Sequence, residues 1–149
     1  MAILNLQASY FSIENPLRLV DRWLNRAIYR QTVRINRRGV EICWTGRAER
    51  ELRRRERALA VEMQLYFSCV VKKRILFHDE TDFDTVAVDD RLSLGFRPIA
   101  SAVCDPREFA ANFPAARSLS DRKALQMVPR RLEIDFSQCE WQGRYLYCS

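Results

Sequence analysis

Apolar residues recur at helical spacing near the start of the chain. Asn15 suits a helix N-cap, and Pro16 suits the first helical turn. The apolar residues that then repeat on one side are Leu17, Val20, Trp23, Leu24, Ala27 and Ile28. On another side every fourth residue is an arginine: Arg18, Arg22, Arg26 and Arg30. The pattern predicts an amphipathic N-terminal helix with a basic stripe.

The period then changes from helical to alternating. Val33 and Ile35 alternate with polar residues, and Val40, Ile42 and Trp44 resume the alternation after residues 36–39. Strict alternation is typical of a half-buried strand, and the sequence Asn-Arg-Arg-Gly at residues 36–39 is typical of a turn. We therefore predict a β-hairpin.

Residues 47–57, RAERELRRRER, return to a helical pattern. On a helical wheel Ala48 and Leu52 fall in one narrow sector with Leu59. Thr45 is a suitable N-cap. The pattern predicts a short helix with one apolar face.

This segment holds six arginines and three glutamates in eleven positions. Glu49 and Glu51 lie four residues before Arg53 and Arg55, a spacing that favours ion pairs on a helix. The other arginines share the sector opposite the apolar face: Arg47, Arg50, Arg54 and Arg57. We expect them to form an outward cationic row.

The longest alternating run spans residues 59–77. Its odd-numbered residues are apolar except Lys73, and most of its even-numbered residues are polar. A period of two predicts strand, but at ~3.3 Å per residue the run is too long for one strand of so small a domain. We expect two antiparallel strands, or one strongly coiled strand, with the turn or bend near residues 72–74.

The second half of the chain predicts short elements. An acidic segment at residues 79–84 precedes two short strands, near residues 85–88 and 92–96. Two short helices are expected at residues 105–113 and 120–127.

The C-terminal residues alternate again. Leu132, Ile134 and Phe136 are followed, after a turn expected near residues 142–143, by Tyr145 and Tyr147. This pattern predicts a second hairpin.

The order of these elements predicts an α+β fold. Strands that are adjacent in sequence imply a mostly antiparallel sheet, covered by an N-terminal helix and two or three short helices. An open sheet and a partly closed small barrel are both compatible with this order. No linker or internal repeat interrupts it, so residues 1–149 are predicted to form a single globular domain.

Composition bounds the class of protein. A chain of 149 residues with 48% hydrophobic and 30% charged residues is typical of one soluble domain. No apolar run approaches the roughly 18 residues needed to cross a bilayer, and no export signal is visible, so we expect a cytoplasmic protein without membrane contact. The five cysteines include no C-x-x-C pair, which favours reduced thiols over disulfides or a zinc site.

The net charge of +6 is unevenly distributed. Residues 18–57 carry 13 arginines and five acids, a net +8, whereas the rest of the chain carries 12 bases and 14 acids, a net −2. Residues 79–90 hold six acids and no base. A basic segment of this kind attracts anionic macromolecules. The chain has 22 arginines and only three lysines, a bias that the base composition of a genome can also produce without any role in phosphate binding.

One cluster is a candidate for catalysis: His78, Asp79, Glu80, Asp82 and Asp84. Carboxylates with one imidazole suit a divalent ion, as in a metal-dependent hydrolase. The glycine and distal glutamate of an EF-hand are missing, and a solvated loop has the same composition. Phosphate-binding, dinucleotide-binding and nucleophile-elbow motifs do not occur. We predict no cofactor, no metal and no catalytic residue, and keep the hydrolase as an alternative.

The arginine arrays favour a binding function. Guanidinium groups bind phosphate in a bidentate manner and stack on bases, and Trp44 and Tyr66 could add stacking. We expect a non-catalytic binding domain whose arginine-rich face contacts an anionic macromolecule, RNA or DNA first and an acidic protein second. The candidate residues are Arg18, Arg22, Arg26, Arg30, Arg37, Arg38, Arg47, Arg50, Arg54 and Arg57.

An oligomeric scaffold is a third hypothesis. Edge strands can pair between chains, and Tyr145 and Tyr147 lie in a predicted strand with little sequence after it. Alternatively, both tyrosines complete the core of one chain. A homo-oligomer is therefore kept as a candidate assembly.

Overall fold

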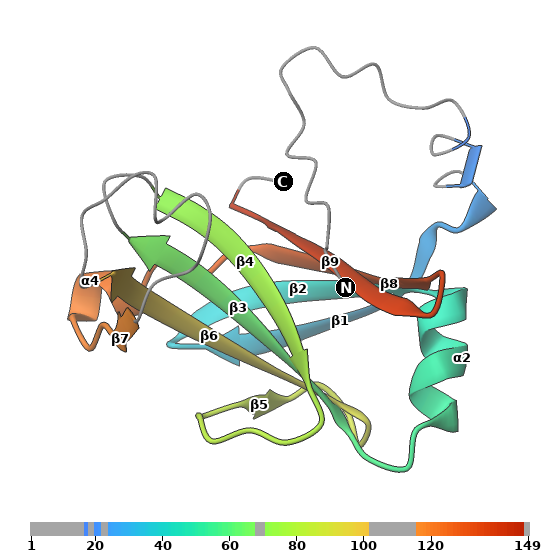
Figure 1. The fold of residues 1–149 in the computed structure, drawn as a ribbon, viewed down its shortest axis with the longest axis horizontal. Helices are drawn as coiled ribbons and strands as arrows, with labels where there is room; N and C mark the ends of the chain where they lie inside the picture. The colour runs from blue at the N-terminus through green and yellow to red at the C-terminus, as the bar shows by residue number, and fades with distance from the viewer. Residues whose placement is uncertain (1–16, 18–19, 22–23, 68–70, 102–115, 148–149) are drawn as a thin grey trace.

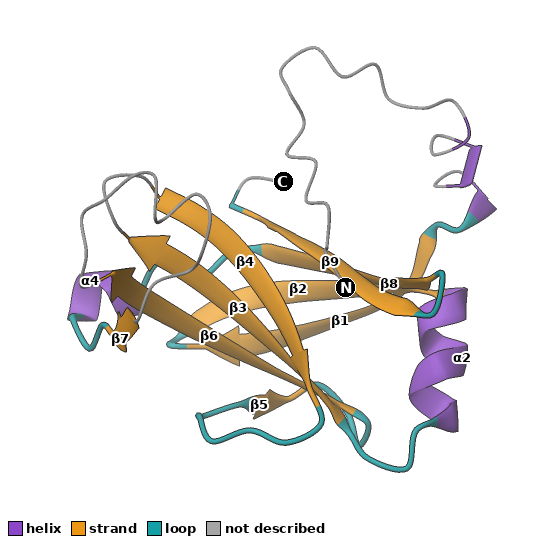
Figure 2. Cartoon of the chain, in the orientation of Figure 1, coloured by secondary structure: helices purple, strands orange, loops and turns teal. Residues whose placement is uncertain are grey.

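The chain forms two β-sheets that pack around one apolar core (Figure 1, Figure 2). The computed structural model describes residues 17, 20–21, 24–67, 71–101 and 116–147. Within these ranges the elements are β1 (Ala27–Ile35), β2 (Arg38–Thr45), α2 (Gly46–Arg54), β3 (Leu59–Phe67), β4 (Val71–His78), β5 (Val86–Ala87), β6 (Leu92–Ser101), β7 (Ala116–Ser118), α4 (Arg122–Leu125), β8 (Arg131–Ser137) and β9 (Glu140–Leu146).

Each sheet joins strands from distant parts of the sequence. The four-stranded sheet has the order β1-β2-β8-β9, and the second sheet has the order β4-β3-β6-β5, with β7 also paired to β6. Paired strands that are neighbours in sequence run antiparallel, whereas β2 pairs with β8, and β3 with β6, in parallel. The two parallel pairs therefore hold the centre of each sheet.

The core lies between the sheets because alternate residues of each strand face inward. Its buried side chains include Val40, Ile42 and Trp44 from the four-stranded sheet and Val61, Met63 and Leu65 from the other. Burial of apolar surface, at ~25 cal/mol per Å², is the main stabilising contribution of such a layer.

The two sheets meet closely where β9 passes β4. The rings of Phe77 and Trp141 stack with their centroids 6.0 Å apart. A Cβ atom at Gly143 would lie 3.1 Å from Cδ1 of Ile75 and 3.2 Å from Cζ of Phe77. The absence of a side chain at Gly143 therefore lets β9 lie against β4.

Helix α2 carries the chain from the first sheet to the second. The hydroxyl of Thr45 accepts a hydrogen bond from the Ala48 backbone N–H at 3.2 Å, which confirms the predicted N-cap. Ala48 and Leu52 are buried, which confirms the predicted apolar face. The helix accordingly turns its other side, rich in arginine, away from the core.

The predicted α+β fold class is wrong, because the chain is mostly β. Two sheets, each with a parallel pair at its centre, replace the single, mostly antiparallel sheet. The helix predicted at residues 120–127 is reduced to one turn, Arg122–Leu125. The helix predicted at residues 105–113 lies outside the described residues.

The predicted N-terminal helix does not extend to Arg30. The described residues 17, 20, 21 and 24 are helical, but β1 begins at Ala27. Inside β1 the side chains of Tyr29, Val33 and Ile35 pack on the core, and β-branched and aromatic residues are favoured in strands. The last residues of the predicted helix are therefore in a strand. From Tyr29 onward core-facing and outward-facing side chains alternate, and this alternation outweighs the helical spacing.

Both predicted hairpins are confirmed, but one has its turn elsewhere. Strands β1 and β2 are joined at Asn36 and Arg37, inside the predicted turn, with φ angles of 49° and 67°. Strands β8 and β9 are joined at Gln138 and Cys139, with φ angles of 53° and 62°, whereas residues 142–143 lie inside β9. Positive φ at both residues of a two-residue turn suits the twist of a hairpin.

The long alternating run forms two antiparallel strands, the first of the two predicted alternatives. They are separated between Phe67 and Val71, and residues 72–74 lie inside β4 rather than at the turn. On β3 the polar side chains of Glu62 and Gln64 are buried as well as the apolar ones. Burial of both faces is a feature that alternation alone does not predict.

The turn between β8 and β9 gives a test of this geometry. Cys139 is exposed and holds a φ of 62°, a conformation that costs a side-chain-bearing residue ~1 kcal/mol or more and costs glycine little. Cys139→Gly is expected to raise the free energy of unfolding by about 0.5–1 kcal/mol in urea denaturation. Cys139→Ser removes the thiol but keeps the strain, so it should leave stability unchanged. A glycine variant no more stable than the serine variant would contradict the assigned turn.

Candidate anion-binding surface

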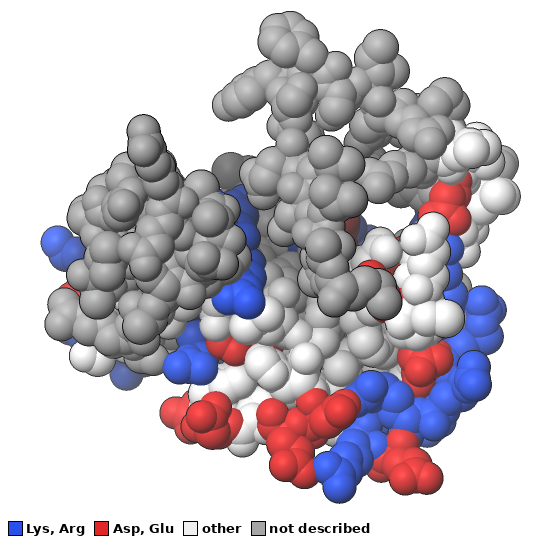
Figure 3. Space-filling model, in the orientation of Figure 1, with Lys and Arg blue, Asp and Glu red and all other residues white. Residues whose placement is uncertain are grey.

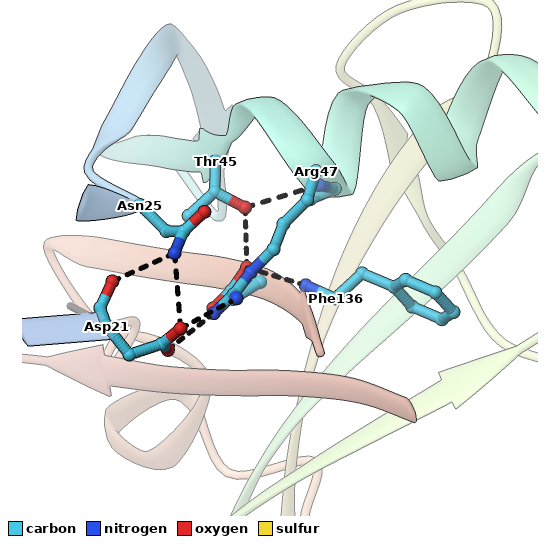
Figure 4. Close-up of polar contacts among 7 residues, drawn as sticks. Asp21, Asn25, Thr45, Arg47 and Phe136 are labelled. Atoms are coloured by element: carbon cyan, nitrogen blue, oxygen red, sulfur yellow. Dashed lines mark hydrogen bonds and ion pairs between the residues drawn. The ribbon is translucent and has the colours of Figure 1, made fainter. Parts of the chain in front are cut away.

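Arg47, the first arginine of α2, is held by two carboxylates. Its Nη2 lies 2.5 Å from Oδ2 of Asp135 on β8 and 2.9 Å from Oδ2 of Asp21, and its side chain is only 18% exposed. Asp135 also accepts a hydrogen bond from the Thr45 hydroxyl at 2.6 Å, and Asn25 donates to Asp21 (Figure 4). We name these ion pairs the Arg47 clamp. They make Arg47 a structural residue, not an outward ligand for anions.

The clamp shifts the pKa values of its carboxyl groups. Burial raises the pKa of Asp135, but hydrogen bonds from Arg47 and Thr45 outweigh it, and the net shift is downward from the usual 3.8. The hydrogen bond from Arg47 likewise lowers the pKa of Asp21. Both carboxylates are therefore ionised in the folded protein at neutral pH and stabilise it through Arg47.

Most of the remaining α2 arginines have carboxylate partners. Arg53 pairs with Glu49 at 2.8 Å, as predicted, whereas Glu51 pairs with Arg54, at 3.9 Å, and not with Arg55. The acidic segment that follows β4 supplies further partners, because Arg55 bonds Asp79 and Arg57 lies 2.5 Å from Glu80. Figure 3 shows acidic and basic side chains side by side at this end of the molecule. Of the four arginines predicted to form an outward row, Arg47, Arg54 and Arg57 therefore each have a carboxylate neighbour. Arg50 is exposed and has none among the described residues. We call these four the α2 row.

The other predicted array is divided. Arg18 and Arg22 lie outside the described residues, and Arg26 is exposed just before β1. Arg30 is on the outer face of β1, 3.8 Å from Glu41. It begins a ladder of alternating charge across the four-stranded sheet, whose members are Arg30, Glu41, Arg131, Glu133 and Arg144. Arg30 is therefore also compensated.

The cations at the turn between β1 and β2 are in a different situation. Arg37 and Arg38 are exposed, and Asn36 beside them donates a hydrogen bond to the Leu125 carbonyl at 2.7 Å, which fixes the turn against α4. This contact brings Lys123 of α4 to the same end of the molecule. No ion pair to a carboxylate is found for these three cations among the residues that the structure describes.

Lys73 and Tyr147 complete this surface. The Nζ atom of Lys73 lies 5.2 Å from the ring centroid of Tyr147, and the Tyr147 hydroxyl donates to the Met127 carbonyl at 3.0 Å. Burial raises the pKa of Tyr147 to about 12, so the hydroxyl keeps its proton at neutral pH. We call Arg37, Arg38, Lys73 and Lys123 the tip cluster.

A pocket of about 300 Å³ opens within the tip cluster. It is lined by Arg38, Lys123, Gln126, Met127, Val128 and Tyr147. We call it the tip pocket. The described residues of its lining combine two cations with an apolar wall and include no carboxylate.

The predicted arginines do not all lie at one end of the molecule. Helix α2 follows Thr45, which pairs with Ala27 at the start of β1, whereas the tip cluster lies beyond Ile35 at the other end. Nine residues of strand, at ~3.3 Å each, separate the two ends by roughly 30 Å. The predicted residues Arg37 and Arg38 therefore lie apart from Arg47, Arg50, Arg54 and Arg57.

The predicted alternative, a metal site at His78, loses its ligands to other contacts. His78 Nε2 lies 3.1 Å from Oε2 of the buried Glu62, while Asp79 and Glu80 turn toward arginines. Asp82 and Asp84 line a different pocket, of about 440 Å³. Among the described residues, no group of three His, Cys, Asp or Glu side chains is arranged to hold a metal ion.

Sequence reasoning missed several residues of the tip surface. Lys73 could have been singled out from the sequence, because it is the one polar residue among the apolar odd-numbered residues of the run 59–77. Tyr147 and Lys123 carried none, since their approach depends on the turn of α4. Trp44 and Tyr66, predicted to help stacking, are buried at 3% and 1% exposure and are not available to a ligand.

No protein-family model, curated protein or solved structure matches this chain. Within the described residues, no helix has the length and apolar character that a membrane span requires.

The Arg47 clamp is testable by substitution. Arg47→Met keeps the length of the side chain but leaves Asp135 without its cation, and we expect a loss of about 1–2 kcal/mol in the free energy of unfolding. Arg53→Met is the matched control, since the Arg53 side chain is 60% exposed and its pair should contribute roughly 0.5 kcal/mol or less. Equal losses in urea denaturation would show that Arg47 is not a structural residue.

The same clamp predicts a pH dependence. Because the folded-state pKa values of Asp21 and Asp135 are lowered, their contribution is complete well above pH 4 and is lost as pH falls through the folded values. The difference in unfolding free energy between wild type and Arg47→Met should therefore be constant from about pH 7 to 5 and shrink below about pH 4. In a background with Asp21→Asn and Asp135→Asn, the Arg47→Met substitution should show no such dependence. A difference that grows on acidification would contradict the assigned pairs.

Proposed function

We propose that this protein is a non-catalytic binding domain for an anionic macromolecule, RNA or DNA first and an acidic protein second. The observation that supports it is the tip cluster, in which Arg38 and Lys123 line one pocket, Lys73 lies over the Tyr147 ring of that pocket, and Arg37 is exposed next to Arg38. None of the four has a carboxylate partner among the described residues. Uncompensated cations close together raise the local positive potential and concentrate polyanions. The contact surface is therefore the tip cluster and not the α2 row.

The expected mode of binding is neutralisation of phosphates with low sequence selectivity. Arginine and lysine contacts to a phosphate backbone fix position but do not read bases. Each phosphate neutralised releases counterions, so affinity falls as salt rises. The compensated arginines of α2 contribute less, because binding a phosphate there must compete with Glu51, Asp79 and Glu80.

A cytoplasmic location is part of this proposal. Cys43 and Cys139 are free thiols, which suits a reducing compartment.

The homo-oligomer stays a prediction that light scattering on the purified protein can check. In favour of the single-chain reading, Tyr145 is 3% exposed and packs in the core of its own chain.

Matched charge reversals test which end binds. The probe is a fluorescein-labelled, mixed-sequence 12-nucleotide single strand of RNA or DNA, titrated by anisotropy at several salt concentrations. Arg37→Glu with Arg38→Glu is expected to weaken binding at least ~10-fold and to reduce the log–log salt slope by about 2. Arg50→Glu with Arg54→Glu makes the same change in net charge and should have a much smaller effect.

Three outcomes would overturn the proposal. They are no binding at low salt, binding that does not depend on salt, and equal weakening by the two double variants. Tight, salt-dependent binding of polyglutamate with none of either nucleic acid would select the acidic protein instead.

A further inference from the structure

We infer that the tip pocket binds one nucleotide of a single-stranded nucleic acid. The base lies on the apolar wall, and the adjoining phosphate lies at the two cations that line the pocket. This inference rests on the proposed function, because it names the unit that the tip cluster contacts.

The size of the pocket suits a single nucleotide. Its volume of about 300 Å³ is at the lower end of the ~300–1,000 Å³ typical of small-ligand sites. A base in a duplex is stacked and paired, and its faces are not accessible to a side chain. An unpaired strand is therefore the form of nucleic acid that the pocket can accept.

The wall of the pocket suits a planar, apolar face. Tyr147 is half-buried, and its hydroxyl is bonded to the carbonyl of Met127, so the ring is held in place before a ligand arrives. Met127 is 43% exposed and presents a flexible thioether next to it. Aromatic side chains held in this way are the usual platforms for bases of single strands.

The cations are arranged to take the phosphate. Arg38 and Lys123 line the pocket from β2 and α4, on either side of the contact between Asn36 and Leu125. Lys73 adds positive charge next to the Tyr147 ring. A nucleotide carries the anionic group for these cations and the planar face for the apolar wall in a single unit, so it matches the complete lining.

The base contact is tested with the full chain and two oligonucleotides. One is a 12-nucleotide single strand, and the other has the same backbone with all its bases removed. We expect the strand with bases to bind about 5- to 100-fold tighter. Tyr147→Leu should abolish this difference without changing the affinity for the abasic strand, whereas Tyr147→Phe, which keeps the ring, should retain it. A preference for bases that survives Tyr147→Leu would overturn the inference.

A second measurement uses the unmodified protein, which covers the case that Tyr147→Leu does not fold. Irradiation with a 5-iodouridine strand, followed by peptide mass spectrometry, should give crosslinks at Tyr147 or Met127. Crosslinks confined to other segments would overturn the inference. Equal binding of both strands, still weakened by the Arg37 and Arg38 reversals, would reject the base pocket and keep the proposed function. No binding of either strand would reject both.

Discussion

The ion pairs of Arg47 with Asp135 and Asp21 join three segments that are far apart in the sequence. They fix the start of α2 to β8, at the point where the chain passes from one sheet to the other. Because Asp135 is partly buried, the guanidinium group cannot leave it without a cost in stability. Arg47 is thus held by the fold and is not available to an external anion.

The fold distributes its charges unequally between two ends. At the α2 end, glutamates of the helix and the acids after β4 pair with Arg53, Arg54, Arg55 and Arg57. At the other end the turn between β1 and β2 meets α4, and cations from three elements come together around an apolar wall. A dense run of arginines in the sequence is therefore not by itself an uncompensated surface, since most arginines of residues 47–57 have a carboxylate neighbour.

Local patterns predicted which segments contain strands, but they misplaced the start of β1 and two turns and did not predict the architecture. Alternation located β1–β2, β3, β4 and β8–β9, and the cap at Thr45 with the apolar face of Ala48 and Leu52 located α2. The pairing of β2 with β8 and of β3 with β6 was not readable, because parallel partners have no local signature. The same long-range pairing decides which cations meet. Arg37 and Arg38 could be named in advance, whereas Lys123 and Tyr147 could not.

The parallel pairing of β2 with β8 also constrains how the chain folds. Thr45 and Asp135, bonded across this pair, are 90 residues apart, so the first sheet stays half-built until β8 has been synthesised. Until then the edge of β2 that pairs with β8 has no partner strand. The apolar side chains of Val40, Ile42 and Trp44 lie next to this open edge. Closing so long a loop is slow, and an unpaired strand edge invites association with other chains. The hairpin carries four arginines and one glutamate, and repulsion between like charges opposes such association.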